Sequence, residues 1–581
     1  MRLALVQHPK PRRMAGLFYG RLRDVALGLL FLACLAPAIT LLLYSNIALN
    51  AGERVTVIGA SALSLLVLYA LLERFPRAAL LLLAGASAIA LLEIRFIADY
   101  GWPINANSLS LIAETNTAEA RDLLGSLPSG LIAGWAAVAA LTLAVWPGAA
   151  PATPLRRRRR ILVYSLAGSA ALTALAFVST PAADAEGDDA IFPPQIYGQA
   201  LALRGAFPAG LPFVVTDYFR ERHALKVAYE RNQRFRFGAT GAKSDHPRVF
   251  VLVIGETSRA DRWGLNGYAR DTTPQLGARH DLIAFRHMLS PWSYSRQAVP
   301  TIVSRKPPSN TSAVFDEASI VTAFKEAGFH TTWISLQAPV GFFESPISIH
   351  AYEADQVLFL NPVDYTSHGK PDTAAIPELE KILRAPQGQD RFVVIHTLGS
   401  HFQYSNRYPP EFARYLPDRP RDRPARLFDP GDREVLSNAY DNSILFTDHF
   451  LNQAIASLER HPDVESWLFY SSDHGEALFD DCRQYSGHGQ SSRQSHSVAS
   501  LFWASPRYAA GHPEYLRNLR GYRERLVSTA MLFETLTDLG GLTVPGRRQD
   551  NSLAAQNLRK AQEVVTVFDD SGWKCPTPQA P

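Results

Sequence analysis

The sequence has 581 residues, a hydrophobic content of 47% and a formal net charge of +4 at pH 7. This length exceeds one ordinary domain. The first 180 residues hold most of the long apolar runs, whereas the rest has the mixed polarity of a soluble α/β domain. Composition therefore excludes a uniformly soluble protein and predicts a membrane domain at 1–180 that precedes a globular domain.

Long apolar runs predict the membrane-spanning helices. Val25–Tyr44 is twenty residues without a charge, and Val55–Leu72 and Ile161–Val178 are eighteen residues each. Each run is long enough to cross a hydrocarbon core as a helix. Leu131–Trp146 and Ala78–Leu92 are shorter, and the latter crosses only with the apolar residues beyond its end, so a buried or interfacial helix is the alternative there. We expect five spans.

The basic residues predict how these spans are oriented. Residues 1–24 carry six basic side chains against one acid, and Arg156–Arg160 lie between the fourth and fifth spans, whereas 95–128 has an acidic excess. Basic loops stay in the cytoplasm, so the amino terminus is expected there and the carboxyl end outside. Beside an apolar segment, an arginine run is a topology signal and a partner for anionic lipid, so no nucleic acid partner is expected. No cleavage site follows the first span, which excludes a cleaved signal peptide.

Two further segments lie outside the predicted spans. An outward loop at 98–128 contains Asn105–Leu124, whose polar and apolar residues at helical spacing predict a helix on the membrane surface. A connector at 181–246 contains Leu211–Phe235, where aromatic and basic residues interleave. That helix rests either on the bilayer or on the globular domain, which is expected at 247–581.

Cysteines are few. Cys34 lies inside the first span, which leaves Cys482 and Cys575 as the pair on the outer side. An oxidising compartment there would permit a disulfide between them.

The globular part opens with an apolar strand, Val249–Ile254, that runs into Gly255 and Glu256. Strands that alternate with helical stretches such as Asp441–Leu458 predict a mostly parallel sheet with helices on both faces. In such sheets functional groups gather at the carboxyl ends of strands. The further strands are expected at Thr331–Ile334, Arg391–Ile395, Ser466–Tyr470 and Val498–Trp503.

Polar groups follow several of these strands directly. Glu256 follows the first strand, Asp473 and His474 follow Ser466–Tyr470, and His396 and His401 follow Arg391–Ile395. Adjacent Asp and His residues at a strand end are typical metal ligands. His488, between two glycines, lies in the loop after Asp473. Zinc, manganese and magnesium all fit this set of oxygen and nitrogen donors.

Five ordered motifs resemble the bacterial phosphoethanolamine transferases, which include lipid A modifying enzymes and the mobilised colistin (polymyxin) resistance enzymes. The motifs are GETSRADRWGLNGYARDTTP, the hydroxyl cluster before Val299-Pro300, GSHFQYSNRYP, YDNSILFTD and SSDHGEALFDD. The resemblance implies an alkaline phosphatase-like (sulfatase-like) α/β catalytic domain after five transmembrane helices. It also implies a multi-pass protein of the bacterial inner membrane with a periplasmic catalytic domain.

The resemblance implies zinc as the cofactor, bound by Glu256, Asp473 and His474. Counting back five residues from Pro300 places the nucleophile, also a zinc ligand, at Ser295, where relatives have threonine. Ser293 is the alternative nucleophile, because the Cys-Gly-Thr-x-Thr pattern of relatives is absent. The cysteines that form a disulfide around the nucleophile in many relatives are absent too.

The implied reaction begins with attack of the Ser295 hydroxyl on phosphatidylethanolamine, which releases diacylglycerol and leaves phosphoethanolamine on the serine. His401 and His488 would bind the phosphate and transfer protons, and in some relatives they hold a second zinc ion. Thr115 and Glu119, in the outward loop, match two of three residues that contact ethanolamine in relatives. The third position is Leu111 here.

The acceptors of relatives are lipid A, the lipopolysaccharide core and periplasmic glucan. Phe-Asp-Asp at 479–481, in place of the Gly-Glu-Asn usual in lipid A enzymes, favours core or glucan.

Three other classes of protein fit the sequence less well. A sulfatase needs a formylglycine motif, which the globular part lacks. A phosphoglycerol transferase of the lipoteichoic acid type would lack ETNTAEA and YDNSILFTD. A non-catalytic lipid-sensing regulator would not keep competent side chains at every ligand position.

Overall fold

The computed structural model describes fifteen segments of the chain. The fifth expected span, Arg156–Arg160, Thr115, Glu119, Cys482 and Cys575 lie outside them, as does the helix expected at 105–124 apart from Leu109. The described residues are 11–44, 51–100, 103–104, 109, 129–146, 202–203, 205–312, 315–337, 346–361, 370–385, 388–421, 425–427, 429–480, 486–489 and 492–558.

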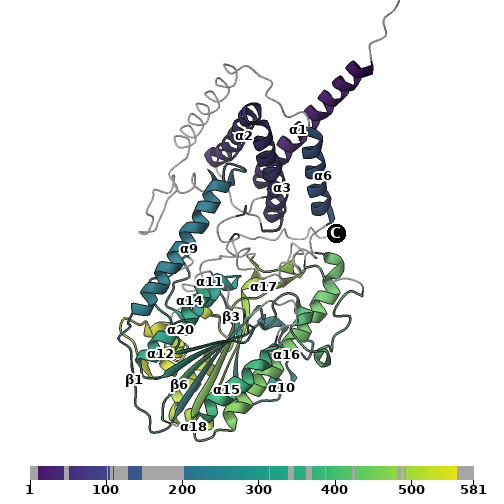
Figure 1. Ribbon diagram of the computed structural model, residues 1–581. Helices are drawn as coiled ribbons and strands as arrows, with labels where there is room; N and C mark the ends of the chain where they lie inside the picture. The colour runs from purple at the N-terminus through teal and green to yellow at the C-terminus, as the bar shows by residue number, and fades with distance from the viewer. Residues whose placement is uncertain are drawn as a thin grey trace, which may run out of the picture. The chain divides into compact units, whose positions relative to one another are not determined.

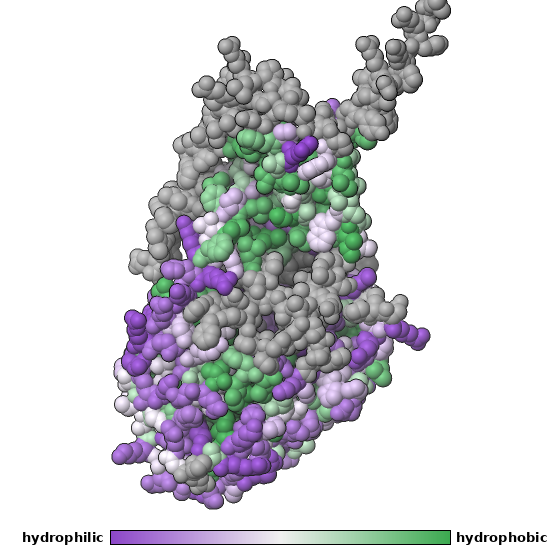
Figure 2. All heavy atoms as spheres, viewed as in Figure 1, coloured by the Kyte–Doolittle hydropathy of each residue, from purple (hydrophilic) through white to green (hydrophobic). Residues whose placement is uncertain are grey.

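The chain separates into two compact units, which divide within one long helix at residue 220. The amino-terminal unit contains α1 (Pro11–Tyr44), α2 (Ala51–Arg74), α3 (Pro76–Tyr100) and α6 (Ser129–Val145). Among its described residues, three apolar stretches are long enough to cross a membrane: Asp24–Leu43, Ala51–Leu72 and Pro76–Ile97. Apolar side chains cover much of these helices in Figure 2.

The third stretch extends the shorter run expected at Ala78–Leu92 to 22 residues, because α3 continues past Glu93. The helix α6 is apolar but has only 17 residues. The number of spans, their orientation and the domain boundaries at 180 and 246 stay predictions.

The dividing helix is α9 (Leu211–Arg234), in place of the helix expected at Leu211–Phe235. Its second half packs on the carboxy-terminal unit, since the Asn232 side-chain amide donates to Glu353 Oε1 at 3.1 Å. Phe213 and Phe219 in its first half are 47% and 62% exposed. Contact of that half with a bilayer stays a prediction.

The carboxy-terminal unit is built on an eight-stranded sheet in the order β11-β3-β10-β7-β2-β6-β4-β5. All neighbouring strands are parallel except β10, which is antiparallel to both β3 and β7. The mostly parallel sheet is thus confirmed. The strands are β2 (Arg248–Gly255), β3 (Leu282–Leu289), β4 (His330–Ser335), β5 (Gln356–Phe359), β6 (Arg391–His396), β7 (Glu465–Ser472), β10 (Ser497–Ala504) and β11 (Val527–Ser528).

The central strand β2 is buried along its whole length, as its continuous apolar sequence predicts. Successive side chains point to opposite faces of the sheet, so each face receives part of the run. Phe250 and Leu252 pack in one hydrophobic core, and Val251 and Val253 pack in the other. A fully buried aliphatic side chain contributes roughly 1.5–3 kcal/mol, so two covered faces stabilise this strand strongly.

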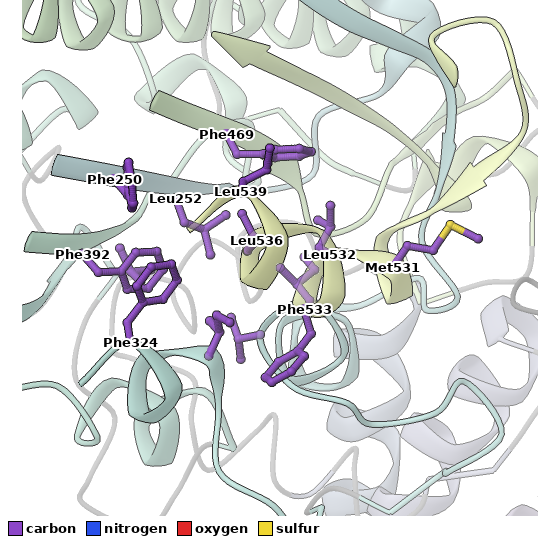
Figure 3. Close-up of a cluster of buried hydrophobic side chains, with 14 of the residues drawn as sticks. Phe250, Leu252, Phe324, Phe392, Phe469, Met531, Leu532, Phe533, Leu536 and Leu539 are labelled. Atoms are coloured by element: carbon purple, nitrogen blue, oxygen red, sulfur yellow. The ribbon is translucent and has the colours of Figure 1, made fainter. Parts of the chain in front are cut away.

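Helices cover both faces of the sheet (Figure 1). One core contains residues of α11, α12, α19 and α20. Part of it is drawn in Figure 3, where Phe324 of α12 and Leu536 of α20 belong to the same cluster as Phe250. The other core contains residues of α15 and α16. The helices are α10 (Pro274–Gly277), α11 (Ser295–Val303), α12 (Ile320–Glu326), α14 (Pro346–Ala351), α15 (Ala375–Arg384), α16 (Arg433–Glu459), α17 (Arg493–His496), α18 (Pro506–Gly511), α19 (Pro513–Tyr522) and α20 (Leu532–Leu539).

Candidate functional site

The site lies where β2 and β7 end side by side. The two strands are parallel, and Gly255 at the end of β2 pairs with Ser472 at the end of β7. The next residues, Glu256 and Asp473, therefore emerge together at the carboxyl edge of the sheet, and His474 follows. All three side chains are at most 1% exposed.

The backbone at the end of β2 is shaped to bring these groups together. A Cβ atom at Gly255 would lie 2.4 Å from the Tyr470 hydroxyl oxygen, so only glycine fits beside β7. Thr257 adopts a φ of 61°, which is unfavourable for a β-branched residue. In that conformation its backbone N–H donates to Asp473 Oδ1 at 3.1 Å. The strained turn thus joins the two candidate ligand segments.

The imidazole of His474 lies against both carboxylates. Its Nδ1–H donates to the Gly475 carbonyl oxygen at 2.8 Å, which directs Nε2 towards the acids. Nε2 lies 3.2 Å from Glu256 Oε1 and 3.6 Å from Asp473 Oδ2. Three potential ligand atoms thus converge on one point inside the protein.

Burial and mutual charge shift the pKa values of all three groups. Burial raises the pKa of Asp473 to about 6, and the neighbouring Glu256 carboxylate adds to this rise. Burial also favours a raised pKa for Glu256, but hydrogen bonding to His474 and its charge outweigh that effect and hold the pKa well below its usual range. For His474, the two carboxylates outweigh burial and raise the pKa to about 10.

A divalent cation fits this group of atoms. The Asp473 Oδ2 atom is buried and makes no hydrogen bond with the described residues, although buried carboxylate oxygens nearly always have a partner. The ligand atoms of Glu256, Asp473 and His474 lie within 4.8 Å of one another. Two carboxylates and one imidazole match the donors of a zinc site with one open position.

Ser295 lies beside these candidate ligand atoms. It is the first residue of α11 and is half-buried. Its hydroxyl oxygen lies 3.1 Å from Glu256 Oε2 and 3.2 Å from His474 Nε2. The positive end of a helix dipole favours an alkoxide at this place. Ser293 is buried instead, and its carbonyl oxygen accepts the Gly489 N–H at 2.8 Å, so the geometry favours Ser295 over Ser293 as the reactive hydroxyl.

Two further histidines border the site. The ring centroid of His488 lies 4.6 Å from that of His474 and 6.3 Å from that of His401. His488 Nδ1–H donates to Glu476 Oε2 at 3.0 Å, and His401 Nδ1–H donates to the Phe402 carbonyl oxygen at 2.7 Å. Both rings therefore leave Nε2 available.

Sequence reasoning assigned no role to two residues that hold the site in place. The fully buried Glu476 carboxylate accepts from the Tyr404 hydroxyl at 2.6 Å as well as from His488. The Gln337 amide donates to Glu256 Oε2 and to the Thr397 carbonyl oxygen, both at 3.0 Å. Glu476 could have been found from its place in the Asp-His-Gly-Glu run, whereas nothing around Gln337 in the sequence marks it.

Comparison with known proteins assigns the chain to a family. Residues 248–542, over half of the chain, match the sequence profile of the sulfatase family. The chain belongs to the sulfatase family. The family assignment agrees with the expected alkaline phosphatase-like fold, which is thereby confirmed.

Relatives within this family are similar over much of the chain. Phosphoethanolamine transferase EptC of Escherichia coli O18:K1:H7 (strain RS218 / NMEC) is 26% identical over 499 residues, which cover 82% of each chain. The Kdo(2)-lipid A phosphoethanolamine 7''-transferase of Salmonella typhimurium is 27% identical over 342 residues, 55% of this chain and 57% of its own. The expected resemblance to phosphoethanolamine transferases is thereby confirmed.

A solved membrane protein shares the fold of both parts. The lipooligosaccharide phosphoethanolamine transferase A (EptA) of Neisseria meningitidis matches with a TM-score of 0.63 and 18% identity. The match covers 90% of this sulfatase-family chain and 99% of the other.

Proposed function

We propose that this protein transfers phosphoethanolamine from phosphatidylethanolamine to an acceptor of the bacterial cell envelope. The observation that carries the proposal is the Ser295 hydroxyl at the start of α11, within 3.3 Å of Glu256 and His474. Relatives named as phosphoethanolamine transferases, aligned over 82% of the chain, support the same reaction. The formylglycine motif of sulfatases is absent from the globular part, so membership of the family does not imply sulfate ester hydrolysis.

In the proposed reaction, Ser295 Oγ attacks the phosphorus of the donor. The bond from phosphorus to the diacylglycerol oxygen breaks, the bond to Oγ forms, and phosphoethanolamine remains on the serine. The hydrogen bond from Ser295 Oγ to Glu256 Oε2 orients the hydroxyl, and its proton is released to solvent as Oγ attacks. A zinc ion held by Glu256, Ser295, Asp473 and His474 would act as a Lewis acid and favour the serine alkoxide.

The two bordering histidines have roles at the diacylglycerol oxygen, which leaves phosphorus, and at the acceptor oxygen, which attacks it. With Nδ1 committed to Glu476, His488 presents Nε2 to protonate the diacylglycerol oxygen. His401 presents Nε2 from the other side and would bind a phosphoryl oxygen or accept the acceptor's proton. An acceptor hydroxyl or phosphate oxygen then attacks phosphorus, the bond from phosphorus to Ser295 Oγ breaks, and Oγ regains a proton from His401 or from solvent.

The proposed location, head-group site and acceptor of the protein concern both units of the chain. We propose that the apolar helices place the chain in the inner membrane with five spans, the amino terminus in the cytoplasm and the catalytic unit in the periplasm. Thr115 and Glu119 are proposed to bind the ethanolamine head group, on the basis of ETNTAEA. Lipid A, core and glucan are the proposed acceptors, and mass spectrometry of these fractions from cells with and without the gene decides among them.

The serine assignment predicts a clear difference between two neighbouring variants. Ser295→Ala in the full-length, detergent-solubilised protein should lower diacylglycerol release from fluorescent phosphatidylethanolamine on the order of 1,000-fold. Intact-protein mass spectrometry should show a phosphoethanolamine adduct on the parent and none on this variant. Ser293→Ala is the matched control and should keep both. Parent activity in Ser295→Ala would show that the assignment is wrong.

A further inference from the structure

A buried lysine lies beneath the turn that carries Ser295. Lys306 is 2% exposed, although lysine is almost never buried without an anionic partner. No carboxylate of the described residues forms an ion pair with it. Its ammonium contacts the side-chain oxygen of Gln297 and lies 5.3 Å from the ring centroid of Trp292.

These two contacts lie on either side of the candidate nucleophile. Trp292 precedes Ser295 by three residues, and Gln297 follows it by two in the first turn of α11. The Gln297 amide also donates to the Thr311 carbonyl oxygen at 3.1 Å, which fixes the side chain that Lys306 contacts. One ammonium group thus contacts Trp292 before Ser295 and Gln297 after it.

A buried ammonium group at this position lowers the stability of the folded protein. Burial lowers the pKa of Lys306 to about 7, which reflects the cost of keeping a charge there. An unbranched apolar side chain would fill similar space without that cost. A feature that costs stability and lies beside reactive groups points to a role in function.

We propose that Lys306 is a positioning residue for Ser295, because its ammonium ties Trp292 to Gln297 and so fixes the direction of the Ser295 hydroxyl. The inference rests on the proposed role of Ser295 as nucleophile. Displacement of a reacting atom by about 1 Å costs about 100-fold in rate. The contribution of Lys306 should therefore appear in the rate of attack and not in donor binding.

The test compares Lys306→Met with Lys325→Met in the full-length, detergent-solubilised protein. Lys325 has a side chain 45% exposed and pairs with Asp355 on the surface, so its variant should match the parent. Lys306→Met should lower kcat for diacylglycerol release from fluorescent phosphatidylethanolamine about 10- to 100-fold. Its KM should stay within about threefold of the parent and its unfolding midpoint should equal or exceed the parent value, because a buried charge is removed.

A structural role gives the opposite result, with a lower unfolding midpoint and an unchanged kcat for the folded protein. That outcome would overturn the inference. Gln297→Leu provides a second route if Lys306→Met fails to fold, since it removes the other partner of the contact. It should lower kcat to a similar extent, and parent kcat in a folded Gln297→Leu would equally overturn the inference.

The Ser295→Ala variant, assayed in parallel, shows whether a negative result concerns Lys306 alone or the nucleophile as well. If Ser295→Ala is inactive and Lys306→Met has parent kcat, the inference fails and the proposed function stands. If Ser295→Ala has parent activity, both fail, because the turn then carries no nucleophile.

Discussion

Single residues at the carboxyl edge of the sheet decide how the Glu256 carboxylate is held. It accepts hydrogen bonds from Thr257 Oγ1 at 2.6 Å, from Gln337 at 3.0 Å and from Ser295. Asp473, by contrast, keeps one oxygen without a hydrogen-bond partner among the described residues. A carboxylate orientated from several sides is typical of a ligand whose direction matters to the metal.

One glycine lets the loop after β6 pack against the backbone of Glu256. Gly399 has a φ of 48°, and a Cβ atom there would lie 2.6 Å from the Glu256 carbonyl oxygen and 2.9 Å from its backbone nitrogen. The Ser400 N–H donates to the same carbonyl oxygen at 2.9 Å. The loop that carries His401 is thereby tied to the Glu256 backbone.

We therefore expect Gly399→Ala to weaken metal binding by about 10- to 100-fold, because the added methyl group must displace the Glu256 backbone. Competition with a zinc chelator, monitored on the full-length protein, measures the change. Gly521→Ala in α19 is the matched control, since a Cβ atom there meets nothing within 4 Å. It should leave zinc affinity unchanged. Equal zinc affinity in the two variants would refute the role of this close approach.

At the scale of elements, α16 explains the motif YDNSILFTD. The Tyr440 hydroxyl donates to the Thr257 carbonyl oxygen at 2.6 Å, which supports the strained turn after β2. Asp441 forms ion pairs with Arg262 and Arg270. The motif is therefore the support of the site, and none of its residues reaches the metal-ligand atoms described above.

The last residue of that motif joins α16 to α10. Asp448 accepts the N–H groups of Gln275 at 3.0 Å and Leu276 at 2.8 Å. Burial raises the pKa of Asp448 from its ordinary value of 3.8 to about 7. A group with a raised folded pKa stabilises the protein fully below the unfolded pKa, and this contribution is lost as pH rises through the folded value.

Asp448→Asn should accordingly flatten the pH dependence of stability between pH values of about 4 and 7, because asparagine does not titrate. Thermal unfolding of the full-length protein across this range, compared with the parent, measures the difference. Asp463→Asn, at a side chain that is 86% exposed, is the control and should keep the parent slope. An Asp448→Asn variant with the parent slope would contradict the prediction.

At the scale of the whole molecule, the proposed metal links function to stability in one unit. Two buried carboxylates lie close together at the site, and burial, together with the charge of Glu256, raises the pKa of Asp473 to about 6. A bound cation offsets the repulsion between the two carboxylates and stabilises only the folded state. The amino-terminal unit contains none of the candidate ligands.

Zinc removal should therefore lower the unfolding midpoint of the carboxy-terminal unit alone. At a free zinc concentration of about 100 times Kd, the expected stabilisation is roughly 3 kcal/mol. Calorimetry of the full-length protein, with zinc and with chelator, checks this. Asp473→Asn should show a smaller difference because one ligand charge is lost. Identical midpoints under both conditions would exclude a metal bound at this site.

The parts of the fold that could be predicted from sequence are those set by local pattern. Continuous apolar runs predicted β2, β6 and β7 because strands covered on both faces bury every side chain. The edge of the sheet was predictable as the functional site because parallel strands end together. β3 was missed, since Arg286 and His287 interrupt its apolar pattern.

The sequence by itself predicted Glu256, Asp473 and His474 as the side chains that carry the chemistry, and the resemblance to phosphoethanolamine transferases added a choice of two serines. Only the tertiary structure decided the contacts between residues that lie far apart in the sequence. It places Ser295 within reach of Glu256, 39 positions away, and buries Ser293. It also brings Gln337 to Glu256 and buries Lys306 beneath the turn. Local pattern reports burial and chain direction, whereas these contacts depend on how the loops close over the sheet, which no short stretch of sequence contains.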